Sequence, residues 1–308
     1  MAPAENRVQV DGREITLSNP EKVLYPKTGT TKAEVIAYYA RIAPAMLPHV
    51  KDRPVTLKRF PDGVSGEPFF EKSCPRFRPD WVKTHGIWSE HRGRAIDYCL
   101  LEDLPSLVWV ANLAALEIHV PLATVEDIER PTVIVFDLDP GAPATIVECA
   151  EVAIALRNRL KELGLETIAK TSGSKGLQLY VPLNINDVSF RATKVFARTV
   201  AEWMEAEMPQ LVVSNMRKEL RKGKVLIDWS QNDQHKTTVA VYSLRGREEP
   251  TVSTPVTWRE VHRVIRTGDP ADLTFGAGEV VARVRKRGDL FAPAVELRQR
   301  VPDAMALL

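Results

Sequence analysis

The sequence predicts an α+β fold in which mixed sheets are flanked by helices, and two observations lead to this prediction. Runs of β-forming residues alternate along the chain with segments of helical periodicity, and such interleaving favours an α/β or α+β catalytic core. The chain has 308 residues, 44% hydrophobic and 27% charged, with no internal repeat or Gly/Ser linker. We therefore expect one catalytic unit over residues 1–308, with an N-terminal lobe over about 1–125 and a core over about 126–308.

Capping signals locate the helices. Thr31-Lys32-Ala33-Glu34 has the spacing of a capping box, so a helix is expected to begin at Thr31. It should end near Pro44 or Pro48, because proline removes a helical hydrogen bond. Further helices are expected over about 104–116, over about 143–163 before Gly164, and from Ser189 onward.

Strands are expected over five β-forming runs: 132–136, 166–170, 177–181, 224–229 and 237–243. The first run ends in two carboxylates one residue apart, Asp137 and Asp139. Strand side chains alternate between faces, so these two point the same way and repel each other unless a cation lies between them. A hard divalent ion is the usual solution, and it predicts metal-assisted phosphoryl transfer.

A third carboxylate, Asp228, follows the run Val225–Ile227 in the same manner. We expect it at the end of a neighbouring strand in the same sheet. Three carboxylates converging there would hold two divalent ions. Taken alone, each aspartate also fits a solvated strand end that is hydrogen-bonded to a turn.

Two further segments could contact phosphates. In Thr171-Ser172-Gly173-Ser174-Lys175-Gly176 the glycines let backbone N–H groups approach a phosphate and Lys175 adds charge, although a plain hairpin turn is the alternative. The Walker spacing is absent. The net charge is only +2, yet residues 217–247 carry eight Lys or Arg against three Asp or Glu. Such a field attracts phosphates, unless it is only a solvated face.

Basic and aromatic residues interleave in the segments 58–60 and 69–72. Bases stack on aromatic faces while Lys and Arg follow the phosphates, so this pattern predicts a nucleic-acid groove, with burial of Phe69 or Phe70 in the core as the alternative. His119 lies in an apolar setting and, taken alone, fits a core histidine better than a ligand contact.

The cysteines and the N-terminus bear on location. Cys74, Cys99 and Cys149 are odd in number and far apart, which predicts reduced, packed thiols rather than a zinc site. The N-terminus has no apolar core of signal-peptide type, and no stretch is apolar for long enough to span a bilayer. We therefore expect a cytoplasmic protein without a membrane partner.

Together these motifs resemble a family, the primase-polymerase enzymes of the archaeo-eukaryotic primase superfamily. The resemblance is strongest to the polymerase module of bacterial non-homologous end-joining DNA ligase D, and it covers nearly the whole chain. Its segments are 19–26, 58–61, 69–72, 117–121, 136–141, 171–177, 228–232 and 242–247. A primase-polymerase catalytic core is therefore the expected fold.

The resemblance implies a role for each matching residue. Asp137, Asp139 and Asp228 would be the catalytic, metal-binding triad for two ions, Mn²⁺ or Mg²⁺. The incoming nucleoside triphosphate would be held by seven residues: Lys58, His119, Ser172, Lys175, Arg221, Gln231 and Arg245. DNA would be bound by Phe69 and Phe70, which stack on template bases, and by Lys22 and Lys32, which grip a downstream 5′-phosphate.

The implied function is template-directed nucleotidyl transfer that fills gaps or extends DNA ends in end joining, with a preference for ribonucleotides. Expected partners are gapped or 5′-phosphorylated DNA, a DNA ligase and an end-bridging protein, at the bacterial nucleoid. The chain departs from the family at Gln178, where histidine is usual, and a neutral amide carries no proton charge. No ligase or nuclease module accompanies it, and its start methionine favours a stand-alone enzyme over an excised module.

Two alternatives remain at this point. A non-catalytic DNA-end adaptor would keep the DNA contacts, but three intact carboxylates argue against it because clustered acids near DNA weaken binding unless metals neutralise them. A metal-dependent phosphatase of the haloacid-dehalogenase type also uses Asp-x-Asp. That family needs Thr or Val two residues after the second aspartate, where this chain has Gly141.

Overall fold

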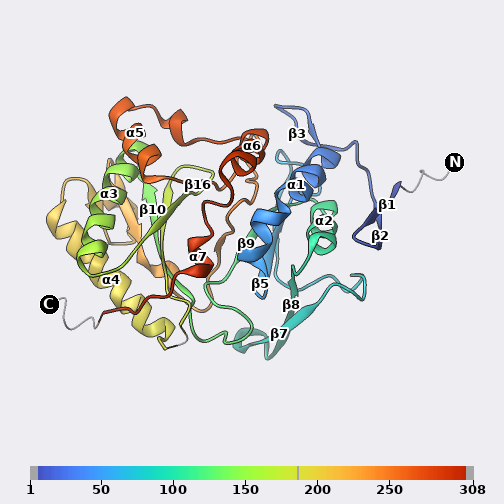
Figure 1. Ribbon diagram of the computed structural model, residues 1–308, viewed down its shortest axis with the longest axis horizontal. Coiled ribbons are helices and arrows are strands. Elements are labelled where there is room, and N and C mark those ends of the chain that lie inside the picture. The colour runs from blue at the N-terminus through green and yellow to red at the C-terminus, as the bar shows by residue number, and fades with distance from the viewer. Residues whose placement is uncertain (1–5, 186, 303–308) are drawn as a thin grey trace.

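The computed structural model describes residues 6–185 and 187–302 and confirms the α+β prediction, with two six-stranded sheets and helices around them (Figure 1). The predicted unit of residues 1–308 extends beyond these residues at 1–5, 186 and 303–308. Its division into lobes near residue 125 stays a prediction. Two short hairpins precede the first helix: β1 Asn6–Val10 with β2 Arg13–Leu17, and β3 Val23–Tyr25 with β4 Thr30–Thr31.

The helices begin where the capping signals placed them. Thr31 and Glu34 form the predicted capping box, and Ser189 caps a helix through its side chain. Seven α-helices lie within the described residues: α1 Lys32–Val50, α2 Leu104–Asn112, α3 Ile146–Glu162, α4 Phe190–Glu207, α5 Trp258–Thr267, α6 Ala277–Arg287 and α7 Pro293–Glu296.

Helix α1 ends at Val50, two residues after Pro48, which agrees with the predicted end near Pro44 or Pro48; its last turns bury Met46 and Val50 completely in the core. One predicted helix end was wrong. Helix α2 stops at Asn112 rather than near Leu116. Ala114 takes a left-handed conformation with φ of 57°, and the residues that follow pair as strand β9 instead.

The first sheet has the order β15-β9-β5-β8-β7, with β6 also paired to β5, and every pairing is antiparallel. Its strands are β5 Pro54–Arg59, β6 Phe69–Glu71, β7 Thr84–Ser89, β8 Arg94–Leu100, β9 Ala115–Val120 and β15 Thr238–Val239. The predicted strand 237–243 is thus only two residues long, because the chain turns away and Tyr242 adopts a φ of 65°. Through β15 the later half of the chain contributes to this first sheet.

The second sheet has the order β13-β14-β10-β12-β11-β16, with only β13 and β14 parallel. Its strands are β10 Val133–Pro140, β11 Ile168–Thr171, β12 Leu177–Pro182, β13 Val212–Val213, β14 Val225–Asp228 and β16 Pro255–Val256. Helices α3 and α4 pack on it, whereas α1 and α2 lie at the first sheet (Figure 1). One continuous hydrophobic core joins the two sheets.

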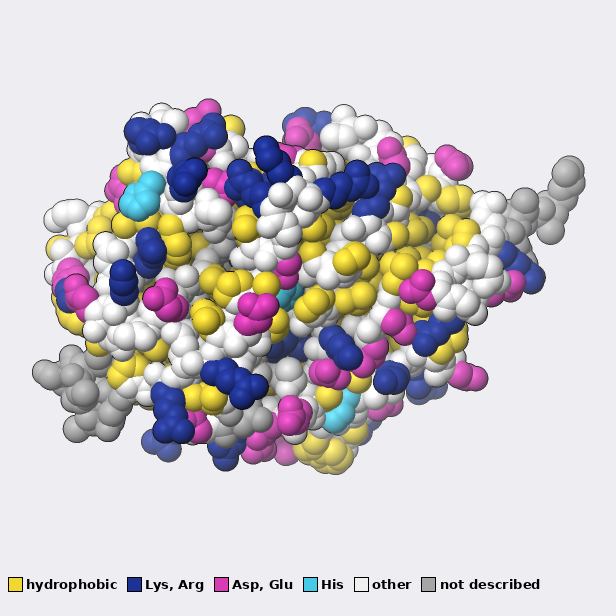
Figure 2. Space-filling model, in the orientation of Figure 1, with side chains coloured by type: hydrophobic (Ala, Val, Ile, Leu, Met, Phe, Trp, Pro, Cys, Tyr) yellow, Lys and Arg dark blue, Asp and Glu magenta, His cyan; other side chains and the backbone are white. Residues whose placement is uncertain are grey.

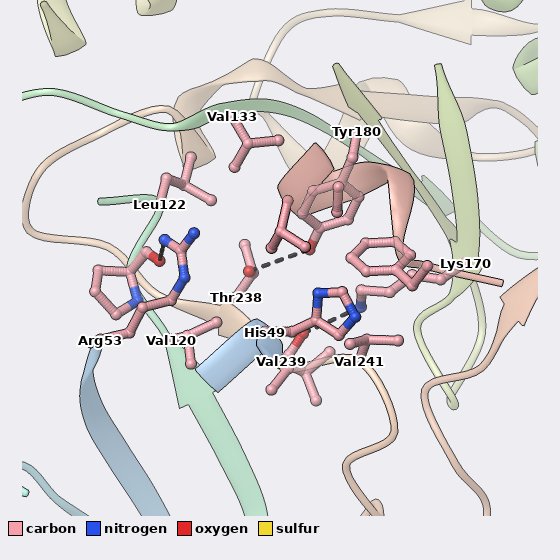
Figure 3. Close-up of a pocket in the computed structure, with 15 residues that line it drawn as sticks. His49, Arg53, Val120, Leu122, Val133, Lys170, Tyr180, Thr238, Val239 and Val241 are labelled. Atoms are coloured by element: carbon pink, nitrogen blue, oxygen red, sulfur yellow. Dashed lines mark hydrogen bonds between the residues drawn. The ribbon is translucent and has the colours of Figure 1, made fainter. Parts of the chain in front are cut away.

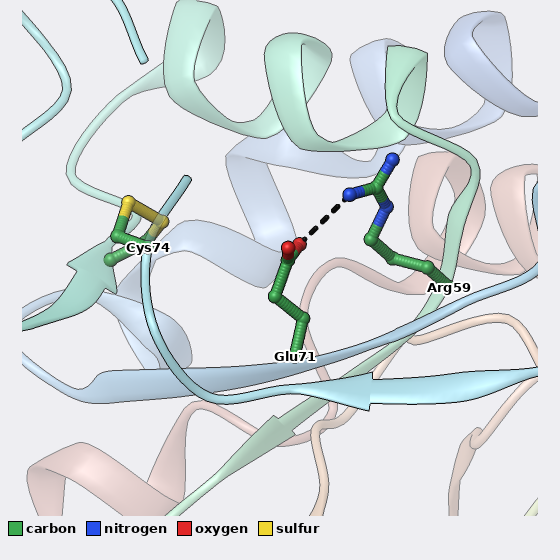
Figure 4. The surroundings of a disulfide bond; sticks show 4 residues. Arg59, Glu71 and Cys74 are labelled. Carbon is green, nitrogen blue, oxygen red and sulfur yellow. Dashed lines mark hydrogen bonds and ion pairs between the residues drawn. A yellow bond between two sulfur atoms is a disulfide. The ribbon is translucent and has the colours of Figure 1, made fainter. Parts of the chain in front are cut away.

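The prediction of three reduced thiols was wrong, since Cys74 and Cys99 form a disulfide and only Cys149 is a free, buried thiol. The two cysteines are 25 residues apart in sequence, but the segment after β6 folds back on β8, where Cys74 N–H donates to the Asp97 carbonyl. Figure 4 shows the disulfide beside the ion pair of Arg59 and Glu71, 3.0 Å.

Basic side chains gather along one edge of the molecule, over α5 and α6 (Figure 2). They include the last turn of α6, Arg285, Lys286 and Arg287, where cations stabilise the negative end of the helix dipole. Among the described residues, no helix is both long and apolar enough to cross a membrane.

Candidate active site

Strands β10 and β14 bring the predicted carboxylates together. Asp137 lies directly opposite Asp228 in the antiparallel register, which confirms that the two strands are neighbours. Asp139 follows two residues later on the same face of β10. Burial and the charge of Asp139 raise the pKa of Asp137 to about 7, and burial with the charge of Asp228 raises the pKa of Asp139. The three carboxylates therefore repel one another, and a cation between them would relieve this repulsion.

The carboxylate of Asp228 is already hydrogen-bonded. Its Oδ1 accepts from Ser230 N at 2.9 Å and from Ser230 Oγ, and its Oδ2 accepts from Gln231 Nε2 at 3.2 Å. Within residues 6–185 and 187–302, no three side chains of His, Cys, Asp or Glu are placed closely enough to hold one metal ion. An ionised carboxylate has about four acceptor positions, so Asp228 keeps lone pairs available beside these bonds.

A cavity of about 300 Å³ opens beside Asp137 and Asp139. Five of the seven predicted nucleotide-binding residues line it: His119, Ser172, Lys175, Gln231 and Arg245. Six other lining residues were not assigned to the nucleotide from sequence: Ser174, Gln178, Thr237, Thr238, Val239 and Arg247. Ser174 and Arg247 lie in segments that were singled out but were given no role of their own, Gln178 stood out as a departure from the family, and Thr237, Thr238 and Val239 lacked a distinctive motif.

Arg221 and Lys58 do not line the cavity but lie close to it. Arg221 partly offsets the raised pKa of Asp139, its guanidinium donates to the Met216 carbonyl, and its buried Nε has no partner. The Arg221 carbonyl packs against Gly141, where a Cβ atom would lie only 1.8 Å from that oxygen. Glycine after the Asp-x-Asp-Pro segment therefore lets the Arg221 loop approach the carboxylates.

The hairpin prediction and the phosphate-loop prediction apply to the same segment. Strands β11 and β12 pair antiparallel, and Ser172 N–H donates to the Gly176 carbonyl across their turn. Gly173 has a φ of 68°, which favours glycine. The Ser172 Oγ accepts from Ser174 N at 3.2 Å and from Gly176 N at 3.1 Å, and Lys175 is exposed at the tip.

The sequence interpretation missed Glu117, a buried carboxylate on β9 that contacts three predicted nucleotide-binding residues. Its Oε2 lies 2.9 Å from His119 Nε2 and 3.5 Å from Arg245 Nε, and its Oε1 lies 3.7 Å from Lys58 Nζ. Gly246 N–H also donates to Oε1, at 3.0 Å. The spacing Glu117-x-His119 places both side chains on one strand face and could have indicated this pair.

These contacts set the protonation of Glu117. Burial raises its pKa, but the hydrogen bond from His119 and the charge of Arg245 outweigh this and lower the pKa to about 2. Burial lowers the pKa of His119 against the opposing effect of Glu117. The imidazole is therefore neutral at pH 7 and reaches Glu117 as a hydrogen-bond donor, so we assign the ionic part of the interaction to Arg245 and Lys58.

Both phenylalanines of β6 are on the surface rather than in the core. Phe69 is 42% exposed and Phe70 is 58% exposed. The Arg59 guanidinium lies 5.3 Å from the Phe69 ring, and the Phe70 ring meets His119 edge-on at 5.6 Å. Phe70 thus contacts His119 at the edge of the 300 Å³ cavity and lines an adjoining groove of about 850 Å³, which Trp88, Arg92 and Lys236 also line.

The two lysines predicted for a 5′-phosphate are neighbours in different settings. Lys22 is exposed and pairs with Asp62 at 2.9 Å. Lys32 is buried and donates to Ser18 Oγ and to the Asn112 carbonyl. Burial and the charge of Lys22 lower the pKa of Lys32 to about 8. A phosphate bound at Lys22 would therefore compete with Asp62 for the ammonium group.

Comparisons with known proteins agree with this architecture. A family model described as LigD, primase-polymerase domain, matches residues 31–291. The chain is 48% identical over 281 residues to the multifunctional non-homologous end joining protein LigD of Mycolicibacterium smegmatis, covering 91% of this chain and 36% of that protein. It is 33% identical over 268 residues to the bifunctional non-homologous end joining protein LigD of Bacillus subtilis, covering 87% of this chain and 42% of that protein.

A solved structure is also similar. The polymerase domain of Mycobacterium tuberculosis ligase D in complex with DNA matches with a TM-score of 0.84 and 43% sequence identity, covering 92% of this chain and 99% of that one. The chain spans 36% to 42% of the length of the curated relatives named above.

Proposed function

Because the chain belongs to the LigD primase-polymerase domain family, we propose that it adds nucleotides to DNA ends and gaps under the direction of a template. The observation that carries the proposal is the cavity in which Asp137 and Asp139 face basic and hydroxyl side chains, with Phe70 at its edge. Acidic groups on one wall suit metal ions, and basic groups on the other suit a triphosphate.

We propose that Asp137, Asp139 and Asp228 hold two divalent ions. Their oxygen donors are the type that Mg²⁺ and Mn²⁺ prefer, and Asp137 and Asp139 share one face of β10 with Asp228 directly opposite Asp137. When bound, such ions lower the pKa of an attacking hydroxyl and stabilise a leaving pyrophosphate. Preference for Mn²⁺ is part of the proposal.

The basic residues of the cavity would bind the nucleotide. Lys175 at the hairpin tip and Arg245 beside it offer point and bidentate contacts to phosphate oxygens, with the Ser172 hydroxyl as a further donor. Arg221 is close enough to Asp139 to lower its pKa, and we propose that it contacts the same phosphates. The sugar and base would be contacted by His119, Gln231 and Lys58, and Glu117 would hold Lys58 in place. We propose that ribonucleotides are preferred.

The DNA contacts follow from the exposed aromatic pair and from the two lysines. Phe69 and Phe70 would stack on template bases, each supported by a cation over its ring. Lys22 and Lys32 would bind a downstream 5′-phosphate, which makes gapped DNA the substrate we propose. In this proposal the protein works in bacterial end joining in the cytoplasm at the nucleoid, together with a DNA ligase and an end-bridging protein.

Primer extension with labelled ribonucleotides and Mn²⁺ tests the proposal. Asp139→Ala should abolish extension and leave DNA binding largely intact, whereas Ala in place of the exposed Asp80 should change neither. Extension retained by Asp139→Ala would overturn the proposed metal site. A wild-type chain that shifts labelled DNA on a gel but never lengthens it would instead support a non-catalytic end adaptor.

A further inference from the structure

A row of polar side chains crosses the second sheet beside the proposed metal site. In the register of four adjacent strands, Asp228 lies opposite Asp137, Asp137 opposite Gln178, and Gln178 opposite Lys170. Residues directly opposite each other in an antiparallel pair share a face of the sheet and lie within contact distance. The row thus runs from the carboxylates to a lysine, with Gln178 between them.

The amide of Gln178 has only one satisfactory orientation. Its Oε1 accepts from Lys170 Nζ at 2.6 Å and from the Tyr180 hydroxyl at 3.2 Å. Burial lowers the pKa of Lys170 to about 7, and the charge of Asp137 opposes this. In the ammonium form Nζ has no lone pair and cannot accept a hydrogen bond, so the oxygen faces Lys170. The Nε2 group then points away from Lys170, and Asp137 is the cross-strand neighbour of Gln178 on that side.

Lys170 is held in place and has no free donor for a substrate. It is 1% exposed, and besides Gln178 its Nζ donates to the Val239 carbonyl at 3.1 Å and to Ser253 Oγ at 2.7 Å. These three acceptors use all three N–H groups of an ammonium. Val239 belongs to β15, so Lys170 is fixed by both sheets. Figure 3 shows a second cavity, lined by residues of both sheets, with Lys170 and Tyr180 in its wall and Thr238 hydrogen-bonded to Tyr180.

We propose that Lys170 is a positioning residue, which holds the Gln178 amide so that its N–H is aimed at Asp137 and fixes this carboxylate for metal binding. The proposal rests on the proposed function for the role of Asp137. It also accounts for Gln178 in place of the usual histidine. A neutral imidazole and a carboxamide each offer an acceptor on one side and a donor on the other, so either can connect Lys170 to Asp137.

The test measures Mn²⁺ affinity, from the paramagnetic resonance signal of free Mn²⁺, together with kcat and KM for primer extension. Lys170→Met and Gln178→Leu should each raise the Mn²⁺ dissociation constant by about 10-fold or more, the usual effect of removing a partner of a metal ligand. If Lys170 acts through Gln178, the double variant should be no worse than Gln178→Leu alone. Gln178→His should keep the dissociation constant within about 2-fold of the wild type, since it restores the connection.

Arg53→Met is the matched control, because Arg53 is another buried cation at the same cavity (Figure 3). It donates to the carbonyls of Pro121 and Ala123 and to Thr132 Oγ1, and to none of the row. Its loss should lower the melting temperature without changing Mn²⁺ affinity.

Three outcomes would overturn the proposal: unchanged Mn²⁺ affinity in Lys170→Met, independent and multiplicative effects of the two variants, or an equal loss in Arg53→Met. If Lys170→Met does not fold, the contrast of Gln178→Leu with Gln178→His decides, and equal affinities refute it. Failure of the wild type to extend primers would refute the proposed function, whereas the Mn²⁺ titrations still test the role of Lys170.

Discussion

Replacing Glu117 by glutamine removes one charge from the centre of the proposed nucleotide site with almost no change of volume. Glu117 is buried, and its two oxygens meet His119, Arg245, Lys58 and the Gly246 N–H. A carboxamide has only one oxygen, so it cannot accept from both sides, and its amino group would face a donor. The variant therefore leaves two cations without their counter-charge in a site that excludes much of the water.

The size of the effect follows from the pKa of Glu117. Its usual value is 4.5 and its value in the folded protein is about 2. At about 1.4 kcal/mol per pKa unit this corresponds to roughly 3 kcal/mol of favourable interaction with the ionised form. Because His119 is neutral at pH 7 and adds no ion pair, we expect Glu117→Gln to lower the free energy of unfolding by about 2–3 kcal/mol.

The pH dependence has a definite sign. The folded-state pKa lies below the unfolded value, so this stabilisation is complete above pH 4.5 and disappears as the pH falls toward 2. The difference between wild type and Glu117→Gln should therefore shrink by about 1 kcal/mol between pH 7 and pH 3.5. Denaturant unfolding at the two pH values measures this difference. As a control, Glu202→Gln removes a charge from an exposed helical pair with Arg198 and should lower the free energy of unfolding by less than about 0.5 kcal/mol.

The same variant should raise the KM for nucleotide by about 10-fold or more, because Lys58, His119 and Arg245 lose their common partner. A destabilisation below about 0.5 kcal/mol at pH 7, or a difference that grows toward low pH, would refute this reasoning. Unchanged KM in a destabilised variant would leave Glu117 with a purely structural role and refute its part in nucleotide binding.

Three other predictions follow from the structure. Phe70→Ala should weaken binding of template DNA by about 1–3 kcal/mol without lowering the melting temperature, because the ring is exposed. Gel-shift titration measures the DNA affinity and thermal unfolding measures the melting temperature. An unaltered DNA affinity would contradict stacking. Reduction of the disulfide, or Cys99→Ser, should lower the free energy of unfolding by about 3 kcal/mol, because the bond closes a loop of 25 residues. Denaturant unfolding with and without reductant measures this, and equal stability would contradict the prediction. Lys22→Met should abolish the preference for gapped DNA that carries a 5′-phosphate. Primer extension with ribo- and deoxyribonucleotides, on gaps with and without the 5′-phosphate, measures this preference. If the variant keeps the preference, Lys22 does not bind the 5′-phosphate as proposed.

Local signals in the sequence located α1 to α4 and the central strands of the second sheet, but the strands β1 to β9 and the helices α5 to α7 were not predicted. A capping box marks the start of α1 and a serine cap marks the start of α4, so both starts were predictable. The end of α2 was not, because the residues after Ala114 pair with β5 as strand β9, which no local pattern shows. The disulfide likewise depends on the return of the segment after β6 to β8, and its two cysteines are far apart in sequence.

Within the site, the residues that were predicted are those that carry a motif, and those that were missed act through another residue. Asp137 and Asp139 were visible because two acids on one strand face need an explanation. Glu117 and Lys170 were not, because a single buried charge in a strand gains its meaning only from the acceptors and donors that other strands bring to it. The register makes this plain for Lys170, whose partner Gln178 is its cross-strand neighbour.

Each sheet thus holds one buried ionisable side chain beside the proposed site. In the second sheet Asp228 and Asp137 lie in one row, and the row ends at Lys170, whose pKa burial lowers to about 7 against the charge of Asp137. On the first sheet the buried Glu117 meets Lys58 and, from a later loop, Arg245. The cations proposed for phosphates therefore come from both sheets, because Lys175 lies in the hairpin between β11 and β12, and the buried partners keep the side chains around them fixed.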